Sequence, residues 1–514
     1  MPPTSRNDYN QQGAATAQDG TSKRSLIAYR RRVLLVGVVI LCSLVLTSTQ
    51  QRVGDGGEYM ALALELSRLK APAMTLGETL EIKGQLDDLK HGFEGLSLGA
   101  AALTSGDGRQ DQVHFWFYSM LAVPEVWLLK LFRLPPYYAF TLLNMALFLG
   151  ALWVASGKLD WPALSLVFLS PVIWWIDKAH TEVFTFSLLA VAMTVTLEQP
   201  WWAMICVAVA STQNPPFALT LPVIALTAIA NRPALLSGRQ LYLGGIVAAA
   251  VASIAPLYYE ARLHALSSAF LTGSALMISP SMVRLSVFLD DPNLGLLVWC
   301  PFLVVATAAT AIALLRRNRQ ILLPVFECLV IASIFAYSFA QTPNLNSGGT
   351  FGLARYAVWL IPLAIPILAM GQAEFGAVFD RWLIPVAVIA ALWSTMIAHP
   401  RYPEAYLQPT WLAERLWLYH PSLNNPMPEV FFERMSHTEG PITPVATSNC
   451  SKILLVGGQA PSRPSHSGDA RRRRRAFSTN CTLGVPIPSV CTQPSAFCYA
   501  NRTSAGYQVV EAPH

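Results

Sequence analysis

The chain has 514 residues, of which 53% are hydrophobic and only 13% are charged, and its net charge is +6 at pH 7. Soluble domains carry about 25% charged residues, so this composition excludes an ordinary soluble enzyme. The remaining charge lies between long apolar runs, which indicates a membrane protein whose basic loops orient its spans and gives no indication of nucleic-acid binding.

The first 32 residues are polar and end in three arginines, Arg30–Arg32. We expect a disordered cytoplasmic arm here. The apolar run at 33–49 follows a long leader and is not succeeded by a small-x-small cleavage site, so we predict an uncleaved first span. Its basic flank places the N-terminus in the cytoplasm.

Apolar runs of spanning length recur up to residue 398. They predict an all-α polytopic protein of the inner (plasma) membrane, with one transmembrane domain at 33–398. We expect about eleven spans, near residues 33–49, 137–156, 161–176, 182–197, 200–213, 216–230, 241–257, 294–315, 321–340, 354–370 and 383–398.

A further run at 114–132 is aromatic-rich but is interrupted by a proline and two charged residues. We expect it to be an interfacial helix within a long first outer loop, 50–136. If it crossed the membrane, the basic loops near 232–239 and 316–319 would lie outside, against the positive-inside bias.

With this topology, the polar clusters suited to chemistry all fall on the extracytoplasmic face, which we predict to be the active face. These clusters are Asp55 with Glu58; Asp177, Lys178, His180 and Glu182; Gln213 with Asn214; Asp290 with Asp291; and Gly348, Gly349 and Arg355.

Carboxylates and a guanidinium on one membrane face are suited to sugar transfer from a polyprenyl-phosphate donor. The lipid tail requires a site at the bilayer, and the acceptor hydroxyl requires a carboxylate base. Carboxylates also stabilise an oxocarbenium-like transition state, by analogy with glycosidases. An arginine can hold two oxygens of the leaving phosphate.

Three stretches resemble motifs of the GT-C superfamily of membrane glycosyltransferases. "GDGGEYMALALEL" is similar to its first-loop motif, and "SPVIWWIDKAHTEVFTFSLLAVAM" is similar to its second outer loop. "GGTFGLARYAVWLIPLAIP" resembles a later loop of bacterial members. The resemblance covers roughly residues 30–400 and identifies no subfamily. It implies an inverting hexosyl or pentosyl transferase with a lipid-linked donor and a lipid or glycan acceptor.

The resemblance also implies roles for single residues. Asp55 takes the position of the catalytic base, and Glu58, one helical turn on, helps to position the acceptor or a metal. Glu182 and His180 match the polar pair of the second loop, where Asp177 also lies. Arg355, together with Lys178, would hold the donor phosphate. The first loop has no strict Asp-x-Asp, so dependence on a divalent metal is left open.

These residues also have structural interpretations. Asp55 followed three residues later by Glu58 resembles a capping box. Glu182 could be an ordinary solvated span end, and Arg355 could extend to lipid headgroups. The acidic pair at 290–291 is more typical of a turn.

Residues 399–514 are expected to be an extracytoplasmic, partly disordered segment whose first part, to about residue 432, folds against the membrane domain. Its four cysteines predict two disulfides of undetermined pairing, and hence an oxidising compartment. The cysteines are Cys450, Cys481, Cys491 and Cys498.

A transporter, flippase or polymerase of lipid-linked glycans is the alternative function. Transporters usually carry ionisable residues near the middle of the membrane and show internal repeats. These spans are nearly free of internal charge and show no repeat, so a transferase is favoured.

Overall fold

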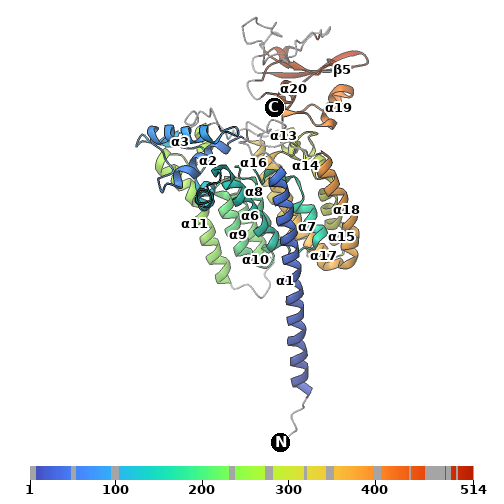
Figure 1. Ribbon diagram of the computed structural model, residues 1–514. Helices are drawn as coiled ribbons and strands as arrows, with labels where there is room; N and C mark the ends of the chain where they lie inside the picture. Colours follow the sequence, from blue (N-terminus) through green and yellow to red (C-terminus); the bar gives the residue numbers. More distant parts are fainter. Residues whose placement is uncertain are drawn as a thin grey trace.

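The computed structural model describes residues 7–47, 54–93, 103–230, 238–272, 282–317, 321–342, 352–397, 407–438, 442–457, 481, 488–493 and 496–512, with side chains from residue 26 onward. Its helices form a bundle, and a small domain sits at the end opposite to the N-terminus (Figure 1). We call this end the outer end, because the sequence predicts that it faces away from the cytoplasm.

Among the described residues, several helices are long and apolar enough to cross a membrane. They are Pro136–Ala155, Gly238–Leu263, Leu322–Ala340, Arg355–Phe375 and Ala377–Ser394, and shorter apolar helices cover Glu182–Val195, Pro200–Ser211 and Pro215–Ala230. The predicted all-α polytopic membrane fold is therefore confirmed. The number of about eleven spans stays a prediction.

The first helix, α1 (Asn7–Thr47), packs its apolar half on α6 (Ala139–Ala155), and Leu41 is buried in this contact. α1 also includes part of the arm at 1–32, and the disorder expected there stays a prediction.

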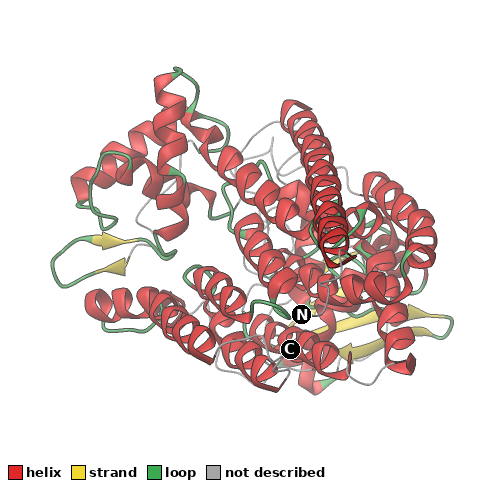
Figure 2. Cartoon of the chain, turned by 90° about the horizontal axis from the view of Figure 1, so that it is seen from below, coloured by secondary structure: helices red, strands yellow, loops and turns green. Residues whose placement is uncertain are grey.

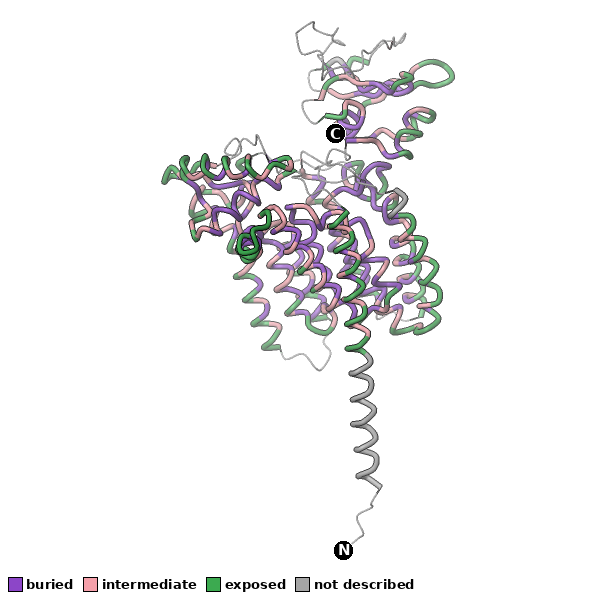
Figure 3. The backbone as a smooth tube through the Cα atoms, in the orientation of Figure 1, coloured by how far each residue is buried: buried purple, intermediate pink, exposed green. Residues whose placement is uncertain are grey.

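The centre of the bundle is α8 (Glu182–Val195), which packs against α6, α9 (Pro200–Ser211) and the 3-10 helix η5 (Arg355–Leu363). A helix that is apolar on every side is stable only when it is surrounded. Figure 3 shows this central part as buried.

Two helices at the periphery expose apolar side chains instead. α11 (Gly238–Leu263) exposes Ile246, and α18 (Ala377–Ile397) exposes Ile389 and Leu392. Such surfaces are expected where helices contact lipid.

The other helices complete the bundle and its connections. Several begin with a proline in the first turn, where its missing N–H leaves no helical bond unmade. The prolines of this kind stand in η1 (Pro136–Tyr138), α7 (Trp161–Phe168), η2 (Pro171–Trp175) and η3 (Pro215–Thr220). The remaining helices are α10 (Leu221–Ala230), α12 (Ser268–Thr272), α13 (Met282–Asp290), α14 (Leu296–Trp299), α15 (Pro301–Arg317), α16 (Leu322–Ala340) and α17 (Ala364–Phe375).

The first outer loop folds into short elements at the outer end of the bundle (Figure 1). The run at 114–132 forms two short helices, in agreement with the expected helix that does not cross the membrane. The elements are α2 (Gly56–Leu66), α3 (Leu76–Leu89), the antiparallel strands β1 (Leu103–Thr104) and β2 (Gln110–Asp111), α4 (Phe117–Leu121) and α5 (Val123–Leu131).

An ion pair holds this loop on the outer end of α11. The Arg262 Nε donates to both oxygens of Asp111, at 2.8 and 3.0 Å, and its Nη2 donates to Ser105 Oγ at 2.8 Å. Nearby, the Tyr259 hydroxyl donates to the carbonyl of Val113 at 3.0 Å. These contacts fix the backbone immediately before His114.

The C-terminal segment contains a small sheet that the sequence did not predict. Its strands form an antiparallel sheet in the order β3-β4-β5-β6, and Figure 2 shows it on the opposite side from the β1–β2 hairpin. The elements are α19 (Trp411–Tyr419), η7 (Pro421–Leu423), α20 (Pro428–Ser436), β3 (Val445–Ala446), β4 (Lys452–Val456), η8 (Ser489–Thr492), β5 (Phe497–Thr503) and β6 (Gly506–Glu511).

The two predicted disulfides are confirmed, and their pairing is now defined. Cys450 pairs with Cys481, and Cys491 pairs with Cys498. A small domain with a limited core commonly needs such cross-links.

The small domain is attached to the loop between α13 and α14. The Asp291 Oδ1 accepts from the backbone N–H groups of Asn293 and Leu294, so the turn interpretation of the pair at 290–291 is confirmed. The Thr410 hydroxyl donates to the carbonyl of Pro292 at 2.7 Å, and its backbone N–H donates to Asn293 Oδ1 at 3.1 Å.

Candidate active site

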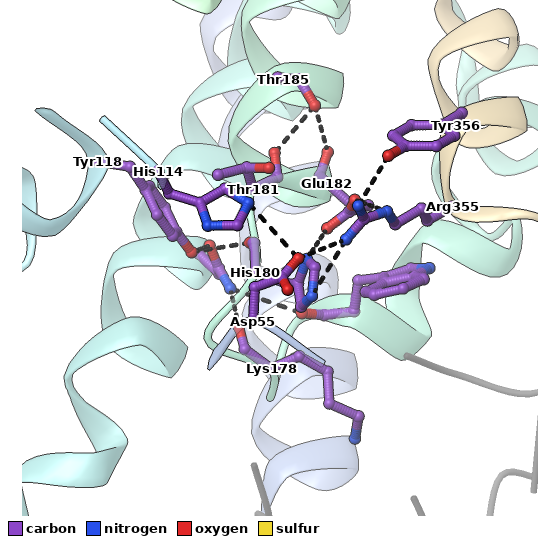
Figure 4. A network of polar contacts seen from close by, with 12 residues as sticks. Asp55, His114, Tyr118, Lys178, His180, Thr181, Glu182, Thr185, Arg355 and Tyr356 are labelled. Atoms are coloured by element: carbon purple, nitrogen blue, oxygen red, sulfur yellow. Dashed lines mark hydrogen bonds and ion pairs between the residues drawn. The ribbon is translucent and has the colours of Figure 1, made fainter. Parts of the chain in front are cut away.

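Side chains from four separate segments meet at the outer end of the bundle (Figure 4). Asp55 precedes α2, His114 precedes α4, His180 and Glu182 lie at the start of α8, and Arg355 begins η5. Segments 300 residues apart in sequence thus form one polar cluster.

Arg355 is the centre of this cluster. Its Nη1 donates to Asp55 Oδ2 at 3.1 Å and lies 3.4 Å from His180 Nε2, and its Nη2 donates to the Tyr356 hydroxyl at 2.7 Å. Its Nε lies 3.8 Å from Glu182 Oε1 and has no hydrogen-bond partner among the described residues. The guanidinium therefore faces two carboxylates and keeps one donor unused.

His180 and Glu182 form a fully buried pair. The Nδ1 of His180 lies 2.7 Å from Glu182 Oε2, and the two side chains are each only 1% exposed. In this geometry His180 donates from Nδ1 to Glu182 and presents Nε2 as an acceptor to Arg355, so Glu182 selects the tautomer. The interpretation of Glu182 as a solvated span end is wrong.

Asp55 lies on the accessible side of the cluster, with 35% of its side chain exposed. Burial raises the pKa of its carboxyl, but His114 and Arg355 outweigh burial and hold that pKa well below its usual range. Asp55 is therefore ionised at neutral pH and can accept a proton.

His114 bridges the two acidic residues of the first loop. Its Nδ1 lies 2.9 Å from Glu58 Oε2, and its Nε2 lies 3.5 Å from Asp55 Oδ2. Burial lowers the pKa of His114, but Asp55 and Glu58 outweigh burial and raise it above the usual value. The raised pKa favours the positively charged form of the ring between the two carboxylates.

Hydrogen bonds from Asn144 of α6 hold the backbone around His180. The Asn144 Nδ2 donates to the carbonyl of Lys178 at 2.8 Å and to that of Ile176 at 3.2 Å. The Tyr118 hydroxyl lies 2.8 Å from Asn144 Oδ1 and 2.9 Å from the carbonyl of His180. These contacts satisfy the carbonyls of a tight buried turn and fix the direction of His180.

The helix-cap interpretation of Asp55 is also wrong. Asp55 occupies the N-cap of α2, but its side chain makes no cap hydrogen bond with the described backbone. Glu58 contacts His114 instead of completing a capping box. Both carboxylates are therefore available to the cluster. In the same way, Arg355 points into the cluster and not toward lipid headgroups (Figure 4).

Two predicted binding residues, Asp177 and Lys178, contact each other and not Arg355. Lys178 Nζ lies 2.7 Å from Asp177 Oδ1, and the Lys178 side chain points away from Arg355 (Figure 4). A role for this pair in holding donor phosphate stays a prediction. Gly348 and Gly349 lie outside the described residues.

Two functional candidates were not recognised in the sequence, His114 and Tyr356. His114 begins the aromatic run, where the polar ring is easily taken for an interfacial residue. Tyr356 follows Arg355 directly, and its ring lies under the guanidinium at 4.7 Å. A Glu58–His114 pairing has no local signal, because the residues are 56 positions apart.

A divalent metal remained open for this cluster on sequence grounds. Among the described residues, no three His, Cys, Asp or Glu side chains are grouped as a metal site requires. Asp55 already faces two basic side chains, Arg355 and His114. We assign no metal-dependent step to this cluster.

No protein-family model matches the sequence, and no curated protein sequence matches it. Two solved structures are similar to the chain. The crystal structure of ArnT from Cupriavidus metallidurans in the apo state matches with 15% identity and a TM-score of 0.40, over 82% of this chain and 72% of that one.

The crystal structure of the same protein bound to undecaprenyl phosphate matches with 14% identity and a TM-score of 0.43, over 80% of this chain and 71% of that one. At this distance the likeness concerns the arrangement of the chain, and the roles of single residues rest on the geometry of this site.

Proposed function

We propose that this protein transfers a sugar from a polyprenyl-phosphate donor to an acceptor hydroxyl on the extracytoplasmic face, with inversion. The observation that carries the proposal is the contact of an ionised, accessible Asp55 with Arg355 at 3.1 Å. A proton acceptor and an anion-binding group are thus side by side. Inverting transfer from a phosphate leaving group requires both groups.

In the proposed reaction, the acceptor oxygen attacks the anomeric carbon as the bond from that carbon to the phosphate oxygen breaks. The acceptor proton passes to Asp55. The electron pair of the broken bond remains on the departing polyprenyl phosphate, where Arg355 stabilises the charge. Tyr356 and the His180–Glu182 pair hold the guanidinium in place for this step.

Arg355 also couples donor binding to the strength of the base. In the structure Arg355 lowers the pKa of the Asp55 carboxyl, which keeps it ionised but makes it a weak base. A donor phosphate would compete with Asp55 for the guanidinium. Once this contact weakens, the pKa of Asp55 rises toward the range in which a carboxylate accepts protons more effectively.

The alternative of a transporter is not favoured by the placement of charge. The cluster lies at the outer end of the bundle and not within it. Among the described residues of the spans, Glu327 in α16 is a buried carboxylate that accepts from the Thr196 hydroxyl at 2.9 Å. It lies about 20 Å along the helix from Ala340, at 1.5 Å per residue, and so apart from the cluster.

The direct test is transfer by purified protein in lipid nanodiscs. Polyprenyl-phosphate hexoses and pentoses are offered with lipid and glycan acceptors, and products are identified by mass spectrometry. Asp55→Asn serves as the inactive control, and Asp107→Asn, in the exposed turn between β1 and β2, as the matched active control. Donor movement across the bilayer without any transfer product would support the transporter instead.

The sidedness of the proposal is tested separately. α2, whose N-cap is Asp55, and the disulfide-bonded domain lie at the same end of the bundle, opposite to the N-terminus (Figure 1). A reporter fused after His514 is expected to read as extracytoplasmic. A cytoplasmic reading would contradict an active site on the outer face.

A further inference from the structure

One helix face of the small domain is left exposed by the described residues. α19 buries Ala413 and Trp417 against the sheet, and its opposite face carries Trp411, Arg415 and Tyr419 at helical spacing. We propose that this face, which we call the α19 face, rests on the outer lipid surface and anchors the small domain there.

The composition of the α19 face fits a membrane interface. The Trp411 side chain is 68% exposed and that of Tyr419 is 67% exposed, and Leu412 lies beside them. Tryptophan and tyrosine concentrate at the headgroup level, because their rings are apolar and their N–H and O–H groups remain wet. The Arg415 guanidinium lies 5.0 Å from the Trp411 ring centroid and supplies the positive charge that anionic headgroups attract.

The position of α19 in the fold places this face near the outer end of the membrane domain. Trp411 follows Thr410, which is hydrogen-bonded to Pro292 and Asn293 in the loop at the outer end of the bundle. In Figure 1, α19 lies between the sheet of the small domain and the outer ends of α15 and α18. The helix thus begins at the rim of the membrane domain and not at the top of the sheet.

The α19 face also continues a surface that already faces lipid. α18 exposes Ile389 and Leu392 along its length and Trp393 near its outer end. The Trp393 Nε1 donates to the carbonyl of Val298, which places this ring beside α14 at the outer end. Thr410, the residue before Trp411, is bonded to the loop that precedes α14, so the α19 face begins beside the same element. Lipid is therefore favoured over a soluble glycan as the occupant.

The test uses the full chain in nanodiscs of phosphatidylethanolamine and phosphatidylglycerol. A photo-crosslinking amino acid, p-benzoylphenylalanine, replaces Trp411 or Tyr419 in separate variants. Leu392 on α18 is the lipid-facing control position, and Ser504, exposed in the turn between β5 and β6, is the water-facing control. After irradiation, lipid adducts are counted by mass spectrometry, with and without added soluble glycans.

Positions 411 and 419 are expected to form lipid adducts at a yield within a few-fold of position 392, and position 504 several-fold fewer. Yields at 411 and 419 that equal the yield at 504 would overturn the proposal. Glycan adducts in place of lipid adducts would also overturn it and assign the face to a glycan. Because the readout is independent of transfer, it can fail without affecting the proposed function.

Discussion

Two aspartate–arginine pairs lie on the outer face, and they are built differently. In the Asp111–Arg262 pair, every guanidinium nitrogen has an acceptor, from both oxygens of Asp111 to Ser105 and Asp107. In the Asp55–Arg355 pair, a single bond of 3.1 Å joins the partners. The guanidinium of Arg262 is thus saturated with hydrogen bonds inside the protein. The guanidinium of Arg355 is shared between several partners.

The difference indicates different roles. A saturated pair gains its full hydrogen bonding within the protein, so a ligand offers it nothing further. Arg355 instead divides its donors between Asp55 and Tyr356 and leaves its buried Nε without a hydrogen-bond partner among the described residues. An unsatisfied buried donor costs about 1–3 kcal/mol, so its persistence needs an explanation. Binding of an anionic substrate is the explanation we favour.

The strongest test of this contrast replaces the acid of each pair. Asp55→Asn keeps the shape of the side chain but cannot accept the acceptor's proton, so transfer should fall about a hundred- to ten-thousandfold. Asp111→Asn should leave transfer per folded molecule nearly unchanged. Initial rates on active-site-titrated protein measure both. If Asp55→Asn transfers sugar at the normal rate, another carboxylate must be the base, and Glu182 is the next candidate.

The next largest effect is expected when the arginine of each pair is replaced by lysine. Arg355→Lys keeps the charge but loses the planar contact with phosphate, which is expected to lower transfer about ten- to hundredfold at unchanged folding. The measurement is kcat/KM together with binding of polyprenyl phosphate alone. If Arg355→Lys binds the lipid phosphate as tightly as the unmodified protein, Arg355 is not the phosphate ligand.

Arg262→Lys is expected to act on stability instead. The lysine cannot reproduce the contacts with Asp111 and Ser105, so the first outer loop should be held less firmly. We expect a loss of roughly 1–2 kcal/mol, since Arg262 is only partly exposed. Thermal unfolding in detergent measures the loss. If Arg262→Lys is as stable as the unmodified protein but inactive, the Asp111–Arg262 pair serves activity and not stability, contrary to this prediction.

Parts of this site could be predicted from the sequence because they are local. Asp55, Glu182 and Arg355 are charged residues at the ends of apolar runs, a placement that costs free energy and so suggests function. The direction of a side chain in a short turn is not local. The contact of Lys178 with Asp177 was therefore not anticipated, and the role of Lys178 at the donor phosphate stays a prediction. His114 was missed because its partners are 56 and 59 positions away.

The fold shows the same division. Long apolar runs predict a helical membrane protein well, because hydrocarbon leaves few alternatives. The sheet of the small domain was not predicted, since its strands are short and the cysteine-rich tail has little apolar periodicity. In β6, Tyr507 and Val509 stand on either side of Gln508, and this short alternation was the usable signal.

The smallest predicted effect concerns His114 and pH. The pKa of His114 is raised by Asp55 and Glu58, so its stabilising charge is fully present below its usual value near 6.5 and is lost as the pH rises through the folded-state pKa. The pKa of Asp55 is lowered, so its contribution is constant from pH 5 to 9. The stability difference between the unmodified protein and His114→Gln should therefore be largest near pH 6, at up to roughly 1 kcal/mol, and should shrink toward pH 9. Unfolding at several pH values measures it, and His91→Gln, whose ring lies against Tyr137, is the matched control. A difference that grows with pH would show that His114 is held neutral, and that Asp55 keeps its charge through Arg355 alone.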